Sequence, residues 1–118
     1  MFHHILCAYD GSPPAEAALD EAIDLASSMH ARLAIATVVE KPPAGVAAAG
    51  VDPEQLAQTL QRTGHAGKEL IKAAEEVRAD VIVLGTRRRG RTANLFGSVA
   101  AELYYHTRLP MLVVSTPD

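Results

Sequence analysis

The residues with the clearest chemical potential follow a short apolar run, Val81–Leu84. Directly behind it come Gly85, the arginine-rich segment Arg87–Arg91, and the pair Gly97 and Ser98. Where a strand leads through such a loop into a helix, free backbone N–H groups and the helix dipole can hold an anion. Guanidinium groups pair well with phosphate oxygens. This stretch therefore predicts a site for a phosphate group or a nucleotide.

The elements that must position this loop are visible in the hydrophobic pattern. Nearly continuous apolar runs, typical of parallel strands covered on both faces, occupy His4–Tyr9, Leu33–Val39, Val81–Leu84 and Met111–Val114. Between the first two runs, small apolar residues recur at helical spacing behind Ser12, a plausible N-cap. The last helix is expected to start at Gly97 and Ser98 and to end before Pro110.

Two connecting segments complete the expected order of elements. Lys41–Asp52 is rich in proline, glycine and alanine, and is either a plain connector or a lid over a ligand. Pro53–Arg78 keeps helical phase and is predicted to be one long helix, with a break near Gly64 and Gly67 as the competing interpretation. The resulting order is β-α-β-α-β-α-β, an α/β fold with a single open parallel sheet and helices on both faces.

Length and composition exclude several classes of protein. A chain of 118 residues with 48% hydrophobic content can build one core, so residues 1–118 are expected to form a single domain. The net charge of −3 argues against nucleic acid as a partner. One cysteine, Cys7, allows no internal disulfide and fits a reducing cytoplasmic setting. No run approaches the roughly 18 apolar residues of a membrane span, so no membrane association is expected.

Five segments in the same order resemble the universal stress protein family along the whole chain. They are Ile5–Ser12, Ala36–Glu40, Ala79–Thr86, Gly97–Ala100 and Leu109–Val114. The resemblance implies a fold of the adenine nucleotide alpha hydrolase type and a site for ATP or AMP. It also implies that one edge strand is deleted here, because Pro53–Arg78 has no β-branched run that could replace the family's third strand.

The resemblance also assigns roles to individual residues. It implies that Asp10 and Val38 hold the adenosine, that Gly85, Gly97 and Ser98 surround ribose and phosphates, and that Val99 offers a backbone N–H. With their neighbours, the candidate binding residues are Ala8, Tyr9, Asp10, Val38, Gly85, Arg87, Arg88, Gly97, Ser98 and Val99. Asp10 could equally fix the turn before Gly11 through its side chain.

One departure from the family pattern keeps two functions open. Arg88 stands where the family loop has its second glycine, and the spacing from Arg88 to Gly97 is one residue shorter. An arginine cannot adopt left-handed backbone conformations as readily as glycine. The chain is therefore either a binder of AMP, ATP or a smaller anion by another geometry, or a dimeric interaction module that does not take ATP.

Further expectations concern catalysis, metals and assembly. Ser98 has no positioned base in the sequence, so no catalytic residues are assigned and at most weak ATP hydrolysis is expected. His3 and His4 are adjacent and would point to opposite faces of a strand, so no metal site is indicated. The resemblance implies a homodimer through the edge strand Met111–Ser115.

Overall fold

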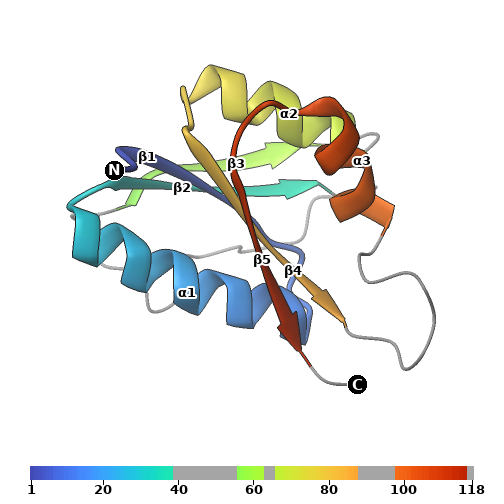
Figure 1. Ribbon diagram of the computed structural model, residues 1–118, viewed down its shortest axis with the longest axis horizontal. Helices are drawn as coiled ribbons and strands as arrows, with labels where there is room; N and C mark the ends of the chain where they lie inside the picture. Colours follow the sequence, from blue (N-terminus) through green and yellow to red (C-terminus); the bar gives the residue numbers. More distant parts are fainter. Residues whose placement is uncertain (39–55, 63–65, 88–97, 117–118) are drawn as a thin grey trace.

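A computed structural model of the chain describes residues 1–38, 56–62, 66–87 and 98–116. The elements are β1 (His4–Ala8), α1 (Pro13–Met29), β2 (Arg32–Val38), β3 (Leu56–Arg62), α2 (Ala66–Glu76), β4 (Val81–Arg87), α3 (Ser98–His106) and β5 (Met111–Thr116). They form a five-stranded parallel sheet in the order β3-β2-β1-β4-β5. Helix α1 covers one face, and α2 and α3 cover the other (Figure 1). The predicted α/β class with helices on both faces is confirmed.

The predicted deletion of an edge strand is wrong, and so is the single helix over Pro53–Arg78. Strand β3 pairs with β2 at the sheet edge, and α2 begins only at Ala66. Leu56 and Leu60 are four residues apart, a spacing that suits a helix face and a strand face equally. The backbone groups along the outer edge of β2 need hydrogen-bond partners, and this tertiary demand outweighs local helical phase.

The other four strands correspond to the four predicted apolar runs and lie in the order β2-β1-β4-β5. The last helix also agrees with its prediction, because α3 begins at Ser98 and ends at His106, ahead of Pro110. Within the described residues, no helix combines the length and apolarity needed to cross a membrane.

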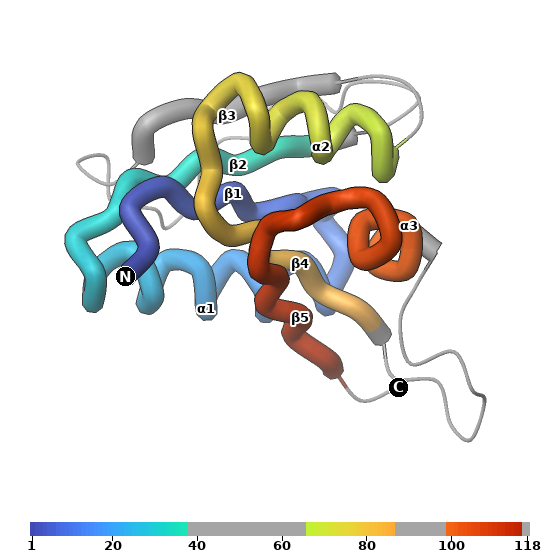
Figure 2. Tube along the Cα trace, turned by 45° about the horizontal axis from the view of Figure 1, so that its top comes forward, coloured from blue at the N-terminus to red at the C-terminus, as the bar shows by residue number. Residues whose placement is uncertain are grey.

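Alternate residues of the central strands build two separate cores, one on each face of the sheet. Beneath α1 lie Ile5, Cys7, Leu33, Ile35, Val81 and Val83. Against α2 and α3 lie Leu6, Ala34, Ala36, Ile82, Leu84, Leu70 and Leu103. The three layers are visible in Figure 2. Because both faces are covered, the strands carry continuous apolar runs instead of alternating ones.

Helix α1 begins as its sequence predicts. The Ala15 N–H donates to the Ser12 hydroxyl at 3.3 Å, and prolines occupy the first two helical positions. Proline suits this place because the first N–H groups of a helix have no intrahelical acceptor. The buried stripe is made of alanines at positions 15, 18, 22 and 26, whose small side chains let the helix approach the sheet closely.

Two helices end in the left-handed conformation without a glycine. His30 closes α1 with φ 53°, and Arg78 follows α2 with φ 55°. In each case the following amide reaches back to close the helix end, Ala31 to the Ala26 carbonyl at 2.9 Å and Ala79 to the Ala74 carbonyl at 2.8 Å. Both helix ends are therefore well capped, but with residue types that favour this conformation less than glycine.

Candidate functional site

Three strands and two helices meet at the carboxyl edge of the sheet. The ends of β2 and β4 and the starts of α1 and α3 lie at the same end of the molecule (Figure 1). Strand β1 pairs with β2 on one side and β4 on the other, so the strand order reverses beside β1. Open parallel sheets bind ligands at such a switch point. Asp10 follows β1, and Gly85 lies in the neighbouring strand β4.

The turn after β1 is held by its own side chains. The Ser12 N–H donates to Asp10 Oδ1 at 2.9 Å, and Gly11 between them has φ 82°, a conformation that favours glycine. Asp10 is exposed. The turn-fixing role that the sequence left open for Asp10 is thus present, and its carboxylate also faces solvent at the switch point.

Ala8 and Tyr9 lie on different faces of the sheet. Ala8 packs against the core under α2 and α3, while Tyr9 packs against the core under α1. The Tyr9 N–H donates to the Ala36 carbonyl at 2.9 Å, and its hydroxyl donates to the Glu16 carboxylate in the first turn of α1. This hydrogen bond raises the pKa of Tyr9 above its ordinary value, with burial and the negative charge of Glu16 adding to the shift.

Gly85 is the point where β4 and the first turn of α1 come closest. A Cβ at this position would lie 2.0 Å from the Pro14 carbonyl oxygen and 2.3 Å from its carbon. Those atoms belong to backbone and cannot rotate away. Gly85 therefore has a packing role that sequence reasoning did not foresee: it lets α1 start directly over β4.

The remaining candidate residues are only partly placed. Val38 ends β2, Arg87 ends β4 and Ser98 begins α3. Val99 is half-buried against the core under α2 and α3. Arg88, Gly97 and the connector or lid at Lys41–Asp52 lie outside the described residues.

Thr37 is a buried polar residue at this edge that sequence reasoning missed. It immediately precedes Val38 and is only 1% exposed, and its hydroxyl finds no hydrogen-bond partner in the part of the chain that the structure describes. Leu33 and Ile35 lie in the core under α1, so strand alternation puts Thr37 on that same face. A threonine within an apolar strand gives no sequence signal of this kind.

Cys7 is a small buried residue in the core under α1. It is fully buried in the centre of β1, and burial raises the pKa of its thiol to about 12. Thiolate is the reactive form, so this side chain is chemically silent near neutral pH. Among the described residues, no group of three or more histidine, cysteine or acidic side chains could hold a metal ion.

Comparisons with known proteins agree with this arrangement. The family model for universal stress proteins matches residues 1–62 and 48–115. The universal stress protein Sll1654 of Synechocystis is 33% identical over 135 residues, covering 97% of this chain and 86% of that protein. Universal stress protein G of Shigella flexneri is 39% identical over 64 residues, which span 54% of this chain but only 44% of that relative's length.

A solved structure supports the fold over nearly the whole chain. A universal stress protein in complex with cAMP matches with a TM-score of 0.74 and 26% identity, covering 96% of each chain. The fold is that of an open parallel α/β protein whose strand order reverses beside β1. The chain belongs to the universal stress protein family.

Proposed function

We propose that this chain binds an adenine nucleotide, ATP or AMP, at the carboxyl edge of its sheet as part of a stress response, with at most weak hydrolysis. The observation that carries the proposal is the exposed Asp10 carboxylate at the switch point, one strand away from the segment that leads to α3. A related structure of this family is described as a complex with cAMP, which is also an adenine nucleotide.

Eight of the ten candidate residues have a role in this proposal. Asp10 and Val38 face the base and the ribose. The groups proposed to face the phosphates are Gly85, Arg87, Arg88, Gly97, Ser98 and Val99. Gly85 also contributes indirectly, because its close approach to Pro14 lets α1 start directly over β4.

Calorimetric titration with ATP and AMP tests the proposal, and the Asp10 turn decides which variants to use. Asp10→Ala would remove both the charge and the acceptor of the Ser12 N–H. Asp10→Asn keeps an acceptor oxygen for that N–H and removes only the charge. We expect Asp10→Asn to weaken nucleotide binding about tenfold, as for loss of one charge-assisted hydrogen bond.

Two results would count against the nucleotide site. One is the absence of measurable binding of both ligands to the parental chain. The other is unchanged affinity in both Asp10→Asn and Ser98→Ala, which would move the ligand away from this edge. Ser98→Ala is expected to have the smaller effect, about fivefold, because it removes a neutral hydroxyl.

The second candidate function is a cytoplasmic homodimeric interaction module that does not take ATP. It is favoured by the apolar edge strand β5, where Leu112 is 38% exposed. We propose that Met111–Ser115 pairs with a second copy of the chain. Light scattering should report a dimer that Leu112→Lys converts to monomer, while Tyr105→Lys on α3 leaves it intact. A monomeric parental chain would refute this assembly.

A further inference from the structure

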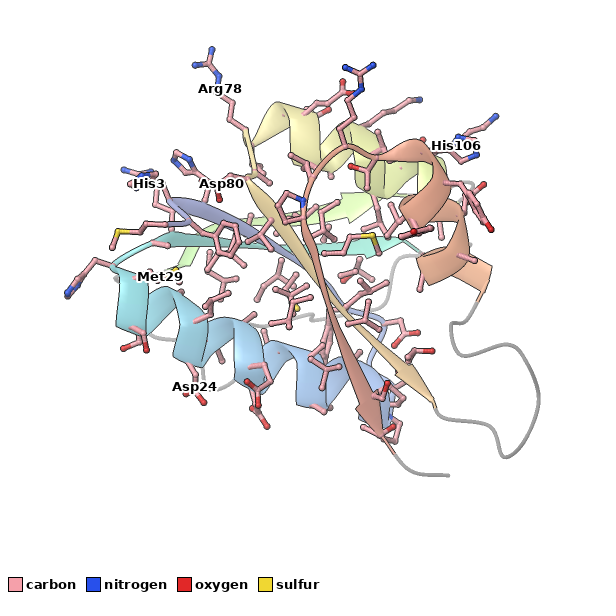
Figure 3. All side chains as sticks on the ribbon, viewed as in Figure 1. His3, Asp24, Met29, Arg78, Asp80 and His106 are labelled. Carbon is pink, nitrogen blue, oxygen red and sulfur yellow. The ribbon has the colours of Figure 1, made fainter. Side chains whose placement is uncertain are left out.

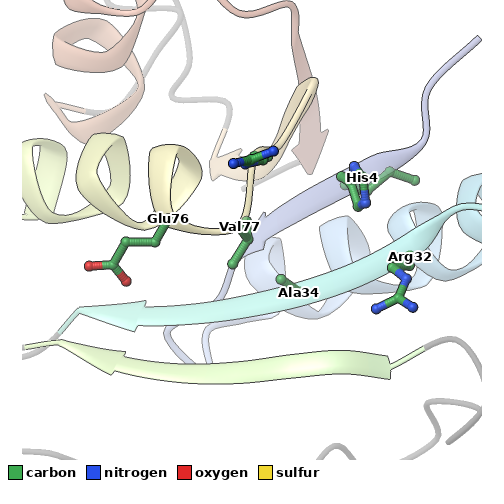
Figure 4. A pocket seen from close by; sticks show the side chains of 7 residues that line it. His4, Arg32, Ala34, Glu76 and Val77 are labelled. Carbon is green, nitrogen blue, oxygen red and sulfur yellow. The ribbon is translucent and has the colours of Figure 1, made fainter.

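A second concave site lies at the amino edge of the sheet, opposite the proposed nucleotide site. It has a volume of about 240 Å³ and sits between the end of α2 and the first residues of β1 and β2 (Figure 4). Its polar lining comes from His4, Arg32, Glu76 and Arg78. No step of the proposed nucleotide binding uses these side chains.

Strand register brings two of these residues together. His4 of β1 and Arg32 of β2 are direct partners in the parallel ladder. Their successors Ile5 and Leu33 belong to the core under α1, so His4 and Arg32 point to the other face, the one that α2 covers. Ala34 follows Arg32 on that face, and its small side chain leaves depth between the strands and α2.

Arg78 reaches the pocket from a backbone position that favours glycine. It follows α2 with φ 55°, and its N–H donates to the Glu75 carbonyl at 3.1 Å. Its exposed side chain extends outward from the end of α2 (Figure 3). A non-glycine residue in this conformation carries a free-energy penalty, so a glycine at position 78 would relieve it.

Two carboxylates, those of Glu76 and Asp80, lie in or near the pocket. Glu76 lies at the end of the pocket opposite His4 and Arg32 (Figure 4). Asp80 immediately precedes β4, and its carboxylate accepts the N–H groups of His3 at 2.8 Å and His4 at 3.1 Å at the start of β1. The lining thus contains two permanently charged guanidinium groups and one carboxylate, and the His4 imidazole adds a further donor.

We propose that this amino-edge pocket binds a small phosphate dianion, either inorganic phosphate or a compact phosphate monoester. Arginine pairs with phosphate through parallel N–H donors, and two arginines entering from different elements can grip different oxygens of one tetrahedral group. The pocket is smaller than the roughly 300–1,000 Å³ of sites that enclose drug-sized ligands. It suits the phosphate group of a ligand better than a whole nucleotide.

An NMR titration of the full chain with inorganic phosphate at constant ionic strength tests this site. Saturable shifts are expected in the amides of His4, Arg32 and Arg78, because these flank the pocket. The double variant Arg32→Gln/Arg78→Gln should raise the dissociation constant at least about tenfold. Arg108→Gln is the matched control, since it removes the same charge from an exposed residue outside the lining.

Arg78→Gly separates binding from structure. Glycine relieves the left-handed backbone, so this variant should unfold at a higher temperature than the parental chain and still lose phosphate affinity. Phosphate shifts that grow linearly without saturation, or that persist unchanged in the double variant, would overturn the proposal. Equal affinity for succinate, a dianion with two separated carboxylates, would overturn the assignment to phosphate.

Discussion

The carboxyl edge and the amino edge of the sheet are held by different kinds of contact. At the carboxyl edge, the closest contact is between backbones, since Gly85 admits the start of α1, and the Asp10 carboxylate closes the turn after β1 by accepting the Ser12 N–H. At the amino edge, the main contacts come from charged side chains. Asp80 accepts two backbone N–H groups at the start of β1, and Arg32 and Arg78 line a pocket.

This difference has a consequence for how each edge tolerates change. A backbone contact has no rotamer to adjust, so an added atom must displace a whole helix. A surface side chain can rotate or be replaced at little expense to the fold. We therefore expect the largest stability effects at the carboxyl edge and the more graded effects at the amino edge.

The largest effect is expected for Gly85→Ala. Its methyl group would overlap the Pro14 backbone, so α1 must shift away from β4, and we expect a loss of about 3 kcal/mol in the free energy of unfolding. Urea denaturation followed by circular dichroism measures it.

Gly67→Ala is the matched control for this change. The nearest atoms to a Cβ there belong to the side chain of Glu102, which is flexible where the Pro14 backbone is not. Alanine also favours a helix over glycine by up to about 1 kcal/mol, so the net change should be small. If the two alanine variants are equally destabilised, rigid backbone contact is not what distinguishes the carboxyl edge.

At the amino edge, the strongest effect should come from Asp80→Ala. It removes the acceptor of two backbone N–H groups, of which the one on His4 is part-buried, and should destabilise the chain by about 2 kcal/mol. Asp80→Asn, which keeps one acceptor oxygen, should be intermediate. Amide hydrogen exchange at His3 and His4 gives a local readout. Unchanged protection of these amides in Asp80→Ala would contradict a stabilising role of the two hydrogen bonds to Asp80.

Thr37→Val is expected to stabilise the carboxyl edge. Valine has nearly the same shape and removes a buried hydroxyl without a partner among the described residues, which should add about 1 kcal/mol to the free energy of unfolding. Thr37→Ser keeps the hydroxyl and loses a methyl group, so it should destabilise. A lower unfolding midpoint for Thr37→Val would mean that the hydroxyl is satisfied in solution.

The smallest effect is expected for Tyr9→Phe, about 0.5 kcal/mol for a hydrogen bond near the surface. Because the pKa of Tyr9 is raised in the folded state, the unfolded chain loses this proton first as pH rises. The contribution is thus complete below the ordinary tyrosine pKa and is lost as pH rises through the folded value. Urea unfolding at pH 8 and above pH 10 should show a steeper loss in the parental chain than in Tyr9→Phe. Parallel pH profiles would contradict it.

Sequence patterns anticipated the centre of this fold well. Four strands are continuous apolar runs because both faces of the sheet are covered, and Ser12 announces the start of α1. The edge strand β3 escaped prediction because an edge strand need not be apolar throughout and its identity depends on pairing with β2. The local sequence pattern of Leu56–Arg62 does not reveal that this segment pairs with β2.

At the candidate site, position was easier to predict than role. Asp10 and Gly85 could be named as candidates from the sequence, and the structure has Gly85 in β4, the strand that pairs with β1, which Asp10 follows. That Gly85 contacts Pro14 and that Thr37 has a buried hydroxyl depend on how closely α1 approaches the sheet. The distance between α1 and the sheet is set by packing, and no sequence pattern predicts it.

The single cysteine offers a practical use that follows from its burial. Cys7 is enclosed in the central strand with a thiol pKa of about 12, so a thiol reagent can reach it only when β1 opens. The rate at which Cys7 is labelled would therefore measure how often β1, the strand between β2 and β4, opens. A second cysteine introduced on the surface would react alone, so a fluorophore could be attached without removing the native one.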